Sequence, residues 1–144
     1  MIRPSDALLK SAHETFANLA FMFIMDESAD VAEGRPPWLA VTVSFTGPLK
    51  GKLTMRVSSE VPAPLAANML GLADDQTPTR EQQLDALREL LNVICGNMLP
   101  LLAGSDEVFN VGAPDIVDAS HLNMVDPMVL YLEAGQAEIS LELM

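Results

Sequence analysis

The strongest candidates for catalysis or binding lie on one predicted helix and are Asp85, Glu89, Asn92 and Gly96. At about 100° per residue, all of them fall on one side of a helix that we expect over residues 79–99. A carboxylate, a second carboxylate, an amide and a gap then follow one another at roughly one-turn intervals. An amide can donate and accept hydrogen bonds. We therefore interpret this polar stripe as a working surface that another molecule can approach.

The opposite side of the same helix is apolar and is expected to be buried. Its residues are Leu84, Leu87, Leu91, Ile94 and Met98. Every amphipathic helix has a polar face, so simple solvation is the alternative explanation of the stripe. Two residues favour function, because Asn92 is a poor helix former and Gly96 costs about 1 kcal/mol relative to alanine.

Other catalytic chemistry finds little support in the sequence. It has no glycine-rich phosphate loop and no nucleophile-elbow pattern. His13 and His121 have no cysteine or carboxylate at metal-ligand spacing, so no metal site is expected. Cys95, the single cysteine, lies among apolar residues late in the predicted helix, which is typical of a core residue rather than a nucleophile.

Composition predicts one globular domain over residues 1–144, with 49% hydrophobic and 19% charged residues. The net charge of −12 argues against nucleic-acid binding, because no basic patch is present to neutralise phosphates. The most apolar run, residues 19–25, is too short to span a bilayer, and no signal peptide is visible. We expect a cytoplasmic protein that does not bind membranes.

Periodicity predicts the elements that must hold the stripe in place. Helices are expected at 5–25 and 61–71, strands at 39–45, 53–57 and 108–111, and a final hairpin of strands at 128–133 and 137–143. Residues 26–37 and 115–127 are expected to be mostly loop. This order indicates an α+β fold, in which a mostly antiparallel sheet is packed by two long helices and a short one.

Three details of the helices follow from local signals. Thr77 or Thr79 is expected to cap the long helix. Pro100 is expected to end or kink that helix near residues 96–99, because proline is not tolerated in an undisturbed helix interior. The last turns of the first helix are apolar all round, which predicts that they are covered on more than one side.

The stripe resembles the signature of the CheC/CheX/FliY phosphatases of bacterial chemotaxis, in the form Asp85-x-x-x-Glu89-x-x-Asn92-x-x-x-Gly96-Asn97. Further segments resemble CheX-like domains in the expected order. They are Glu14-Thr-Phe-Ala-Asn-Leu-Ala-Phe, Gly51-Lys-Leu-Thr-Met-Arg-Val, Leu65-Ala-Ala-Asn-Met-Leu-Gly71 and Phe109-Asn-Val-Gly-Ala-Pro-Asp. The resemblance covers nearly the whole chain and implies a CheC/CheX-like fold.

The resemblance implies an activity and a role for each residue of the stripe. The family dephosphorylates the aspartyl phosphate of the response regulator CheY. Asn92 would enter the partner's phosphorylation site and orient the attacking water, and Glu89 would pair with the partner's active-site lysine. Asp85, Gly96 and Asn97 would contact the partner around them. The chain would need no cofactor of its own, because Mg²⁺ is expected in the partner.

The resemblance also implies a number of sites and an oligomeric state. CheC proteins carry two such sites and CheX proteins carry one. Glu14 and Asn18 on the first helix are four residues apart rather than three, so we count one site and expect a CheX-like homodimer. The alternative is a non-catalytic module of the same fold that binds a response regulator or has a structural role.

Overall fold

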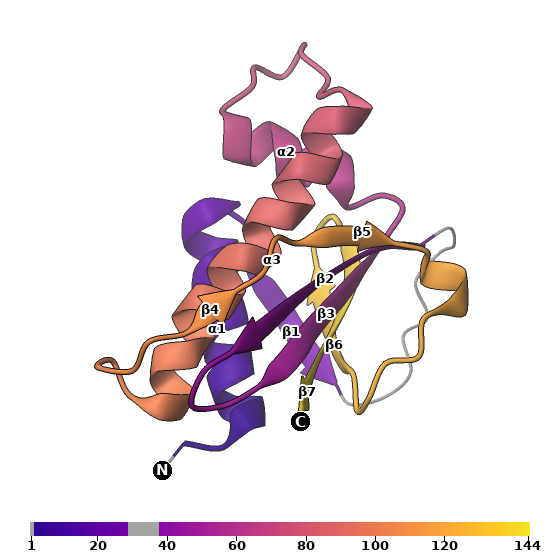
Figure 1. Ribbon diagram of the computed structural model, residues 1–144. Helices are drawn as coiled ribbons and strands as arrows, with labels where there is room; N and C mark the ends of the chain where they lie inside the picture. The colour runs from indigo at the N-terminus through magenta and orange to yellow at the C-terminus, as the bar shows by residue number, and fades with distance from the viewer. Residues whose placement is uncertain (1, 29–37) are drawn as a thin grey trace.

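The computed structural model describes residues 2–28 and 38–144, and these residues form three helices, one short 3₁₀ turn and seven strands (Figure 1). The elements follow the order α1 (Pro4–Leu19), β1 (Ile24–Ser28), β2 (Trp38–Thr46), β3 (Gly51–Ser58), α2 (Pro62–Leu70), α3 (Arg80–Ala103), β4 (Asn110–Val111), β5 (Asp115–Val117), η1 (Ala119–His121), β6 (Met128–Leu132) and β7 (Gly135–Leu143). The predicted α+β class is confirmed.

All strands belong to one antiparallel sheet with the order β1-β6-β7-β3-β2-β4, in which β5 also pairs with β2. The two predicted hairpins are confirmed. In Figure 1, α1 and α3 lie side by side along the sheet, and α2 packs beside the first turns of α3. Two long helices and a short one therefore accompany the sheet, as predicted.

The core lies between the helices and one face of the sheet. Alternate residues of β2 and β3 reach it, and their side chains are fully buried or nearly so. These residues are Val41, Val43 and Phe45 from β2, and Leu53, Met55 and Val57 from β3. They share one apolar cluster with Phe16 of α1 and with Leu87, Leu91, Ile94 and Met98 of α3. Helix α3 is thus part of the core as well as the bearer of the polar stripe.

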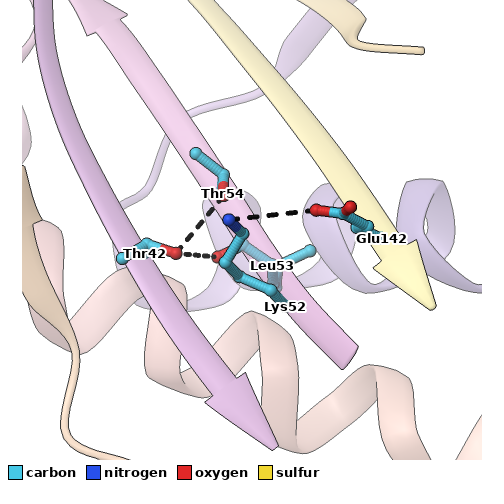
Figure 2. A network of polar contacts seen from close by, with 5 residues as sticks. All are labelled: Thr42, Lys52, Leu53, Thr54 and Glu142. Atoms are coloured by element: carbon cyan, nitrogen blue, oxygen red, sulfur yellow. Dashed lines mark hydrogen bonds and ion pairs between the residues drawn. The ribbon is translucent and has the colours of Figure 1, made fainter. Parts of the chain in front are cut away.

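The other face of the sheet is polar and is joined across strands by side chains (Figure 2). The Thr42 hydroxyl donates to the Leu53 carbonyl oxygen at 3.2 Å and lies 3.3 Å from the Thr54 hydroxyl. Lys52 Nζ lies 3.8 Å from Glu142 Oε2, which ties β3 to β7. Cross-strand pairs of this kind each stabilise a sheet by roughly 0.2–1 kcal/mol. They fix the register of the strands that support α3.

Helix α3 begins with a capping box formed by Thr79 and Gln82. The Thr79 hydroxyl accepts a hydrogen bond from the Gln82 backbone N–H at 3.1 Å, and the Gln82 side chain accepts from the Thr79 N–H at 2.9 Å. Of the two predicted capping residues, the structure therefore selects Thr79.

Of the two expected effects of Pro100, an end of α3 near residues 96–99 is wrong, because the helix continues to Ala103 with Pro100 inside it. Proline lacks the N–H that would bond the carbonyl oxygen of Gly96. Both residues are exposed, so that carbonyl can be solvated, and the apolar Leu99 still packs into the core. Water can therefore replace the hydrogen bond that the proline removes, and tertiary packing keeps the last turn helical.

The prediction that the first helix reaches residue 25 is also wrong. Helix α1 ends at Leu19, and the chain reverses at Phe21, whose φ is +53°. A left-handed residue after a helix is usually glycine or asparagine, so Phe21 gives no stop signal in the sequence. Residues 24–28 instead form strand β1, which pairs with β6.

The apolar end of that predicted helix is covered only in part, because Ala20 and Met22 are buried and other large apolar side chains are exposed. Phe21, Phe23 and Met25 are 68%, 73% and 69% exposed.

Two expected loops and one expected strand differ in the structure. Residues 115–127 contain β5 and η1, and the strand expected at 108–111 begins at Asn110. The first three residues of the loop predicted at 26–37 belong to β1, and the rest of that loop lies outside the described residues.

One helix of the described residues, α3, is long and apolar enough by composition to cross a membrane. Eight of its residues are buried within the domain, and they include Leu87, Leu91, Ile94 and Met98 of the apolar stripe. Its apolar character therefore has an explanation in the core of the protein.

The capping box gives a stability prediction. Thr79→Ala should lower the free energy of unfolding by about 1 kcal/mol, because the N–H of Gln82 loses its acceptor. Urea denaturation followed by circular dichroism measures the change. Thr77→Ala is the matched control and should have little effect. Equal losses in the two variants would contradict the assignment of Thr79 as the cap.

Candidate functional site

The structure confirms that α3 has two opposed faces. Leu87, Leu91, Ile94 and Met98 are buried, and Leu84 is half-buried near the start of the helix. The stripe residues Asp85, Glu89, Asn92 and Gly96 are all exposed. Since the apolar face is held by the core, the backbone beneath the stripe is fixed in place.

The polar groups of the stripe differ in how far they are engaged within the chain. Asp85 accepts a hydrogen bond from Arg88 at 2.7 Å, which partly neutralises its carboxylate. The side chains of Glu89 and Asn92 make no hydrogen bond or ion pair with any residue that the structure describes. A carboxylate and an amide, one turn apart on a rigid helix, are therefore available to a partner.

Gly96 opens a gap in the stripe that the fold itself does not require. A Cβ atom built at this position would meet nothing within 4 Å. The residue also has an ordinary helical backbone rather than a left-handed one. The described structure therefore gives no internal reason for this glycine, which lowers helix stability relative to alanine.

Asn97 has a contact within the chain that the sequence did not predict. Its Nδ2 donates to the hydroxyl of Thr15 at 3.1 Å, and Thr15 is only 2% exposed. This hydrogen bond ties α3 to α1 beside the exposed stripe. Asn97 therefore has a structural role, because it holds α3 against α1.

The remaining candidate residues do not add a second Glu-x-x-Asn pair, a nucleophile or a metal site. Glu14 and Asn18 are exposed on α1, at the four-residue spacing that sets them apart from the Glu89–Asn92 pair. Cys95 is completely buried, and burial raises the pKa of its thiol to about 11. The thiol is therefore neutral at physiological pH and unsuited to nucleophilic attack. Within the described chain, no three His, Cys, Asp or Glu residues are grouped to hold a metal ion.

Sequence reasoning missed a groove of about 370 Å³ that adjoins the stripe. It is lined by Leu19 of α1, Met69 and Leu70 of α2, and Gln82, Asp85, Ala86 and Glu89 of α3. One signal could have revealed it. Met69 and Leu70 are consecutive apolar residues at the end of a short helix, immediately before the Gly71 stop, and consecutive helical residues cannot both point into a core.

The family model for the chemotaxis phosphatase CheX matches residues 39–133. The chain belongs to the CheX family. The matched region includes the whole stripe from Asp85 to Asn97. Family membership confirms the resemblance found in the sequence and supports phosphatase activity at the level of the family.

Solved structures of the CheX and CheC-like families share the fold. CheX from Vibrio vulnificus is 17% identical, with a TM-score of 0.77 over 99% of this chain and 97% of the other. The structure of the CheX-CheY-BeF3-Mg²⁺ complex from Borrelia burgdorferi matches at 16% identity and a TM-score of 0.74, covering 99% of each chain. A CheC-like protein from Shewanella sp. PV-4 is 20% identical, with a TM-score of 0.74 over 100% and 99% of the two chains. No curated protein matches the chain.

The gap at Gly96 leads to a prediction about stability. Gly96→Ala should raise the free energy of unfolding by about 1 kcal/mol, because alanine favours the helix and its Cβ meets no other atom. Urea denaturation measures the change. Gly71→Ala is the contrasting control and should destabilise the protein, because Gly71 has a φ of +67°. If Gly96→Ala destabilised the protein instead, the glycine would be needed for folding rather than for a partner.

Proposed function

We propose that this protein is a phosphatase of a CheY-like response regulator and removes the phosphoryl group from its aspartyl phosphate. The observation that carries the proposal is the exposure of Glu89 and Asn92 on one face of α3, without partners in the described chain and beside the gap at Gly96. Membership of the CheX family supports it.

The reaction needs a positioned water more than it needs a new reactive group. The water oxygen attacks phosphorus, the bond from phosphorus to the aspartyl oxygen breaks, and the carboxylate leaves with the electron pair. The water's protons go to the phosphate product and the solvent. Such a transfer depends on in-line geometry and on neutralisation of the phosphoryl charge. Orienting the water is therefore the contribution that a helper protein can add.

Asn92 has the chemistry for that role. Its neutral amide can accept a hydrogen bond from the water and donate one to a phosphoryl oxygen. A carboxylate at the same place would repel the phosphoryl oxygens, so an amide is the better group. In the proposal, α3 inserts Asn92 into the receiver's phosphorylation site.

The remaining stripe residues dock the helix. The Glu89 carboxylate pairs with the receiver's active-site lysine, which fixes the position of Asn92 one turn away. Asp85 and Gly96 lie on either side of this pair and contact the receiver's surface. Asn97 holds α3 against α1 through Thr15 and borders the contact.

The metal in this scheme belongs to the receiver. The Borrelia burgdorferi complex contains CheY, BeF3 and Mg²⁺ together with CheX. In the proposal, this chain supplies no cofactor and acts on a receiver that carries its own Mg²⁺. The partner is a soluble signalling domain of chemotaxis or of another two-component system, in keeping with the cytoplasmic localisation expected from the sequence.

A non-catalytic receiver-binding or structural module is the alternative function for the same surface. It needs Glu89 for docking but has no need of the amide at position 92. The effects of substituting Asn92 on binding and on turnover therefore distinguish the two functions.

Phosphate release from a phosphorylated CheY receiver domain tests the proposal. The protein should shorten the lifetime of the aspartyl phosphate. Asn92→Ala should lower kcat at least about 100-fold because the water is no longer oriented, while binding is retained. Asn123→Ala, an exposed amide outside α3, is the matched control. A wild-type protein that binds the receiver without shortening the lifetime would support the non-catalytic alternative.

Glu89→Gln should act differently in the same assay. It removes the charge that pairs with the receiver lysine and should raise KM and the dissociation constant about tenfold, because charge-assisted hydrogen bonds contribute more than neutral ones. Glu107→Gln, an exposed carboxylate after α3, is the control. Unchanged binding in Glu89→Gln would remove Glu89 from the docking contact.

We also propose a homodimer formed through residues 21–25. Phe21 and Phe23 directly precede β1, the first strand in the sheet order, and Met25 lies within it; each is more than two-thirds exposed. They line a cavity of about 500 Å³ with Pro64 and Ala134. An exposed group of large apolar side chains at a sheet edge marks a protein–protein contact. A second copy brings an equal apolar surface and buries both.

Sedimentation velocity at micromolar concentration tests the dimer. The wild type should sediment as a dimer, and Phe23→Asp should sediment as a monomer, because it places a charge in the apolar contact. Val108→Asp is the control, because Val108 is 80% exposed and lies in the loop after α3. A monomeric wild type, or a dimeric Phe23→Asp variant, would refute this interface.

A further inference from the structure

The groove beside the stripe is built by three helices that meet near the start of α3. Helix α1 contributes Leu19, α2 contributes Met69 and Leu70, and α3 contributes Ala86 to its apolar wall. Glu89 stands at its edge. The groove is therefore continuous with the surface that the proposed function assigns to receiver docking, but it lies to the side of Asn92.

The groove stays open because of how α2 ends. Leu70 is the last residue of that helix, and Gly71, with a φ of +67°, turns the chain away into the loop that leads to α3. Leu70 is left 50% exposed. Ala86, which also lines the groove, is too small to fill the space and is almost buried.

The polar groups around the groove are mostly engaged within the chain. Asp85 is paired with Arg88 at 2.7 Å. The Gln82 side chain accepts the Thr79 N–H in the capping box. Glu89 alone among these polar residues makes no hydrogen bond or ion pair in the described structure. The remaining binding capacity of the groove is therefore apolar, with one free carboxylate at its edge.

We infer that this groove receives an apolar side chain of the receiver domain, next to the receiver cation that Glu89 binds. The inference rests on the proposed function and adds a determinant of partner choice to it. A receiver that presents an aliphatic or aromatic residue beside its phosphorylation site buries that residue against Leu70, Met69 and Leu19. A receiver with a charged residue there leaves the charge in an apolar groove and is rejected.

The groove and the amide should have separable effects on kinetics. Asn92 acts on the water, whereas the groove acts on the stability of the complex. Loss of the Leu70 contact should raise KM and the dissociation constant about tenfold, because burial of part of a leucine side chain strengthens binding by about that factor. It should leave kcat within about twofold of the wild type, because the geometry at Asn92 is unchanged.

The experiment compares Leu70→Asp, Leu70→Met and Val108→Asp. Binding is measured by titration with a CheY receiver domain that carries BeF3 and Mg²⁺, and turnover by phosphate release from the phosphorylated receiver. Leu70→Asp should weaken binding about tenfold or more without loss of kcat. Leu70→Met should bind like the wild type, and so should Val108→Asp, a charge introduced at an exposed apolar residue outside the groove. Urea denaturation confirms that the three variants are folded.

Other outcomes separate this inference from the proposed function. If Leu70→Asp binds and turns over like the wild type while Asn92→Ala is inactive, the groove inference is overturned and the phosphatase proposal stands. If the wild type binds without turnover and Leu70→Asp binds weakly, the phosphatase proposal fails and the groove inference stands. If the wild type does not bind the receiver, both fail.

Discussion

The structure depends on the burial of one face of α3 against the sheet and α1. Its apolar residues fill the centre of the core, which fixes the helix in rotation as well as in position. That rotation is what turns Glu89 and Asn92 outward. A rotation by one residue, about 100°, would bury one of these polar groups without a partner, at a cost of several kcal/mol. Packing in the core therefore selects the face that is presented.

Several contacts keep the presented face rigid. The capping box holds the first turn of α3, and the hydrogen bond from Asn97 to Thr15 holds its second half against α1. Cross-strand pairs hold the sheet beneath. In the proposed function, a helix held in this way would lose little conformational entropy when the receiver binds, so the Asn92 amide would be inserted already positioned. For a helper that contributes geometry rather than reactive groups, this rigidity is the main requirement.

Much of the fold and of the stripe could be predicted from the sequence. Alternation of apolar residues gives the hairpins, and the helical period gives both faces of α3, because burial forces these patterns. The end of α1 could not be predicted, because Phe21 adopts a left-handed conformation without the usual glycine or asparagine. The continuation of α3 past Pro100 could not be predicted either, because tertiary packing overrides the local signal. The groove beside Glu89 depends on the meeting of three helices, and the sequence marks only one of its walls, through the consecutive apolar residues Met69 and Leu70.

The most direct test of the central claim is a crystal structure of this protein bound to a CheY receiver domain that carries BeF3 and Mg²⁺. We expect α3 to lie across the receiver's phosphorylation site. The Asn92 amide should lie within hydrogen-bonding distance of a water in line with the beryllium–oxygen bond, and the Glu89 carboxylate should contact the receiver lysine. A complex in which another surface of this protein meets the receiver, with Asn92 left in solvent, would contradict it.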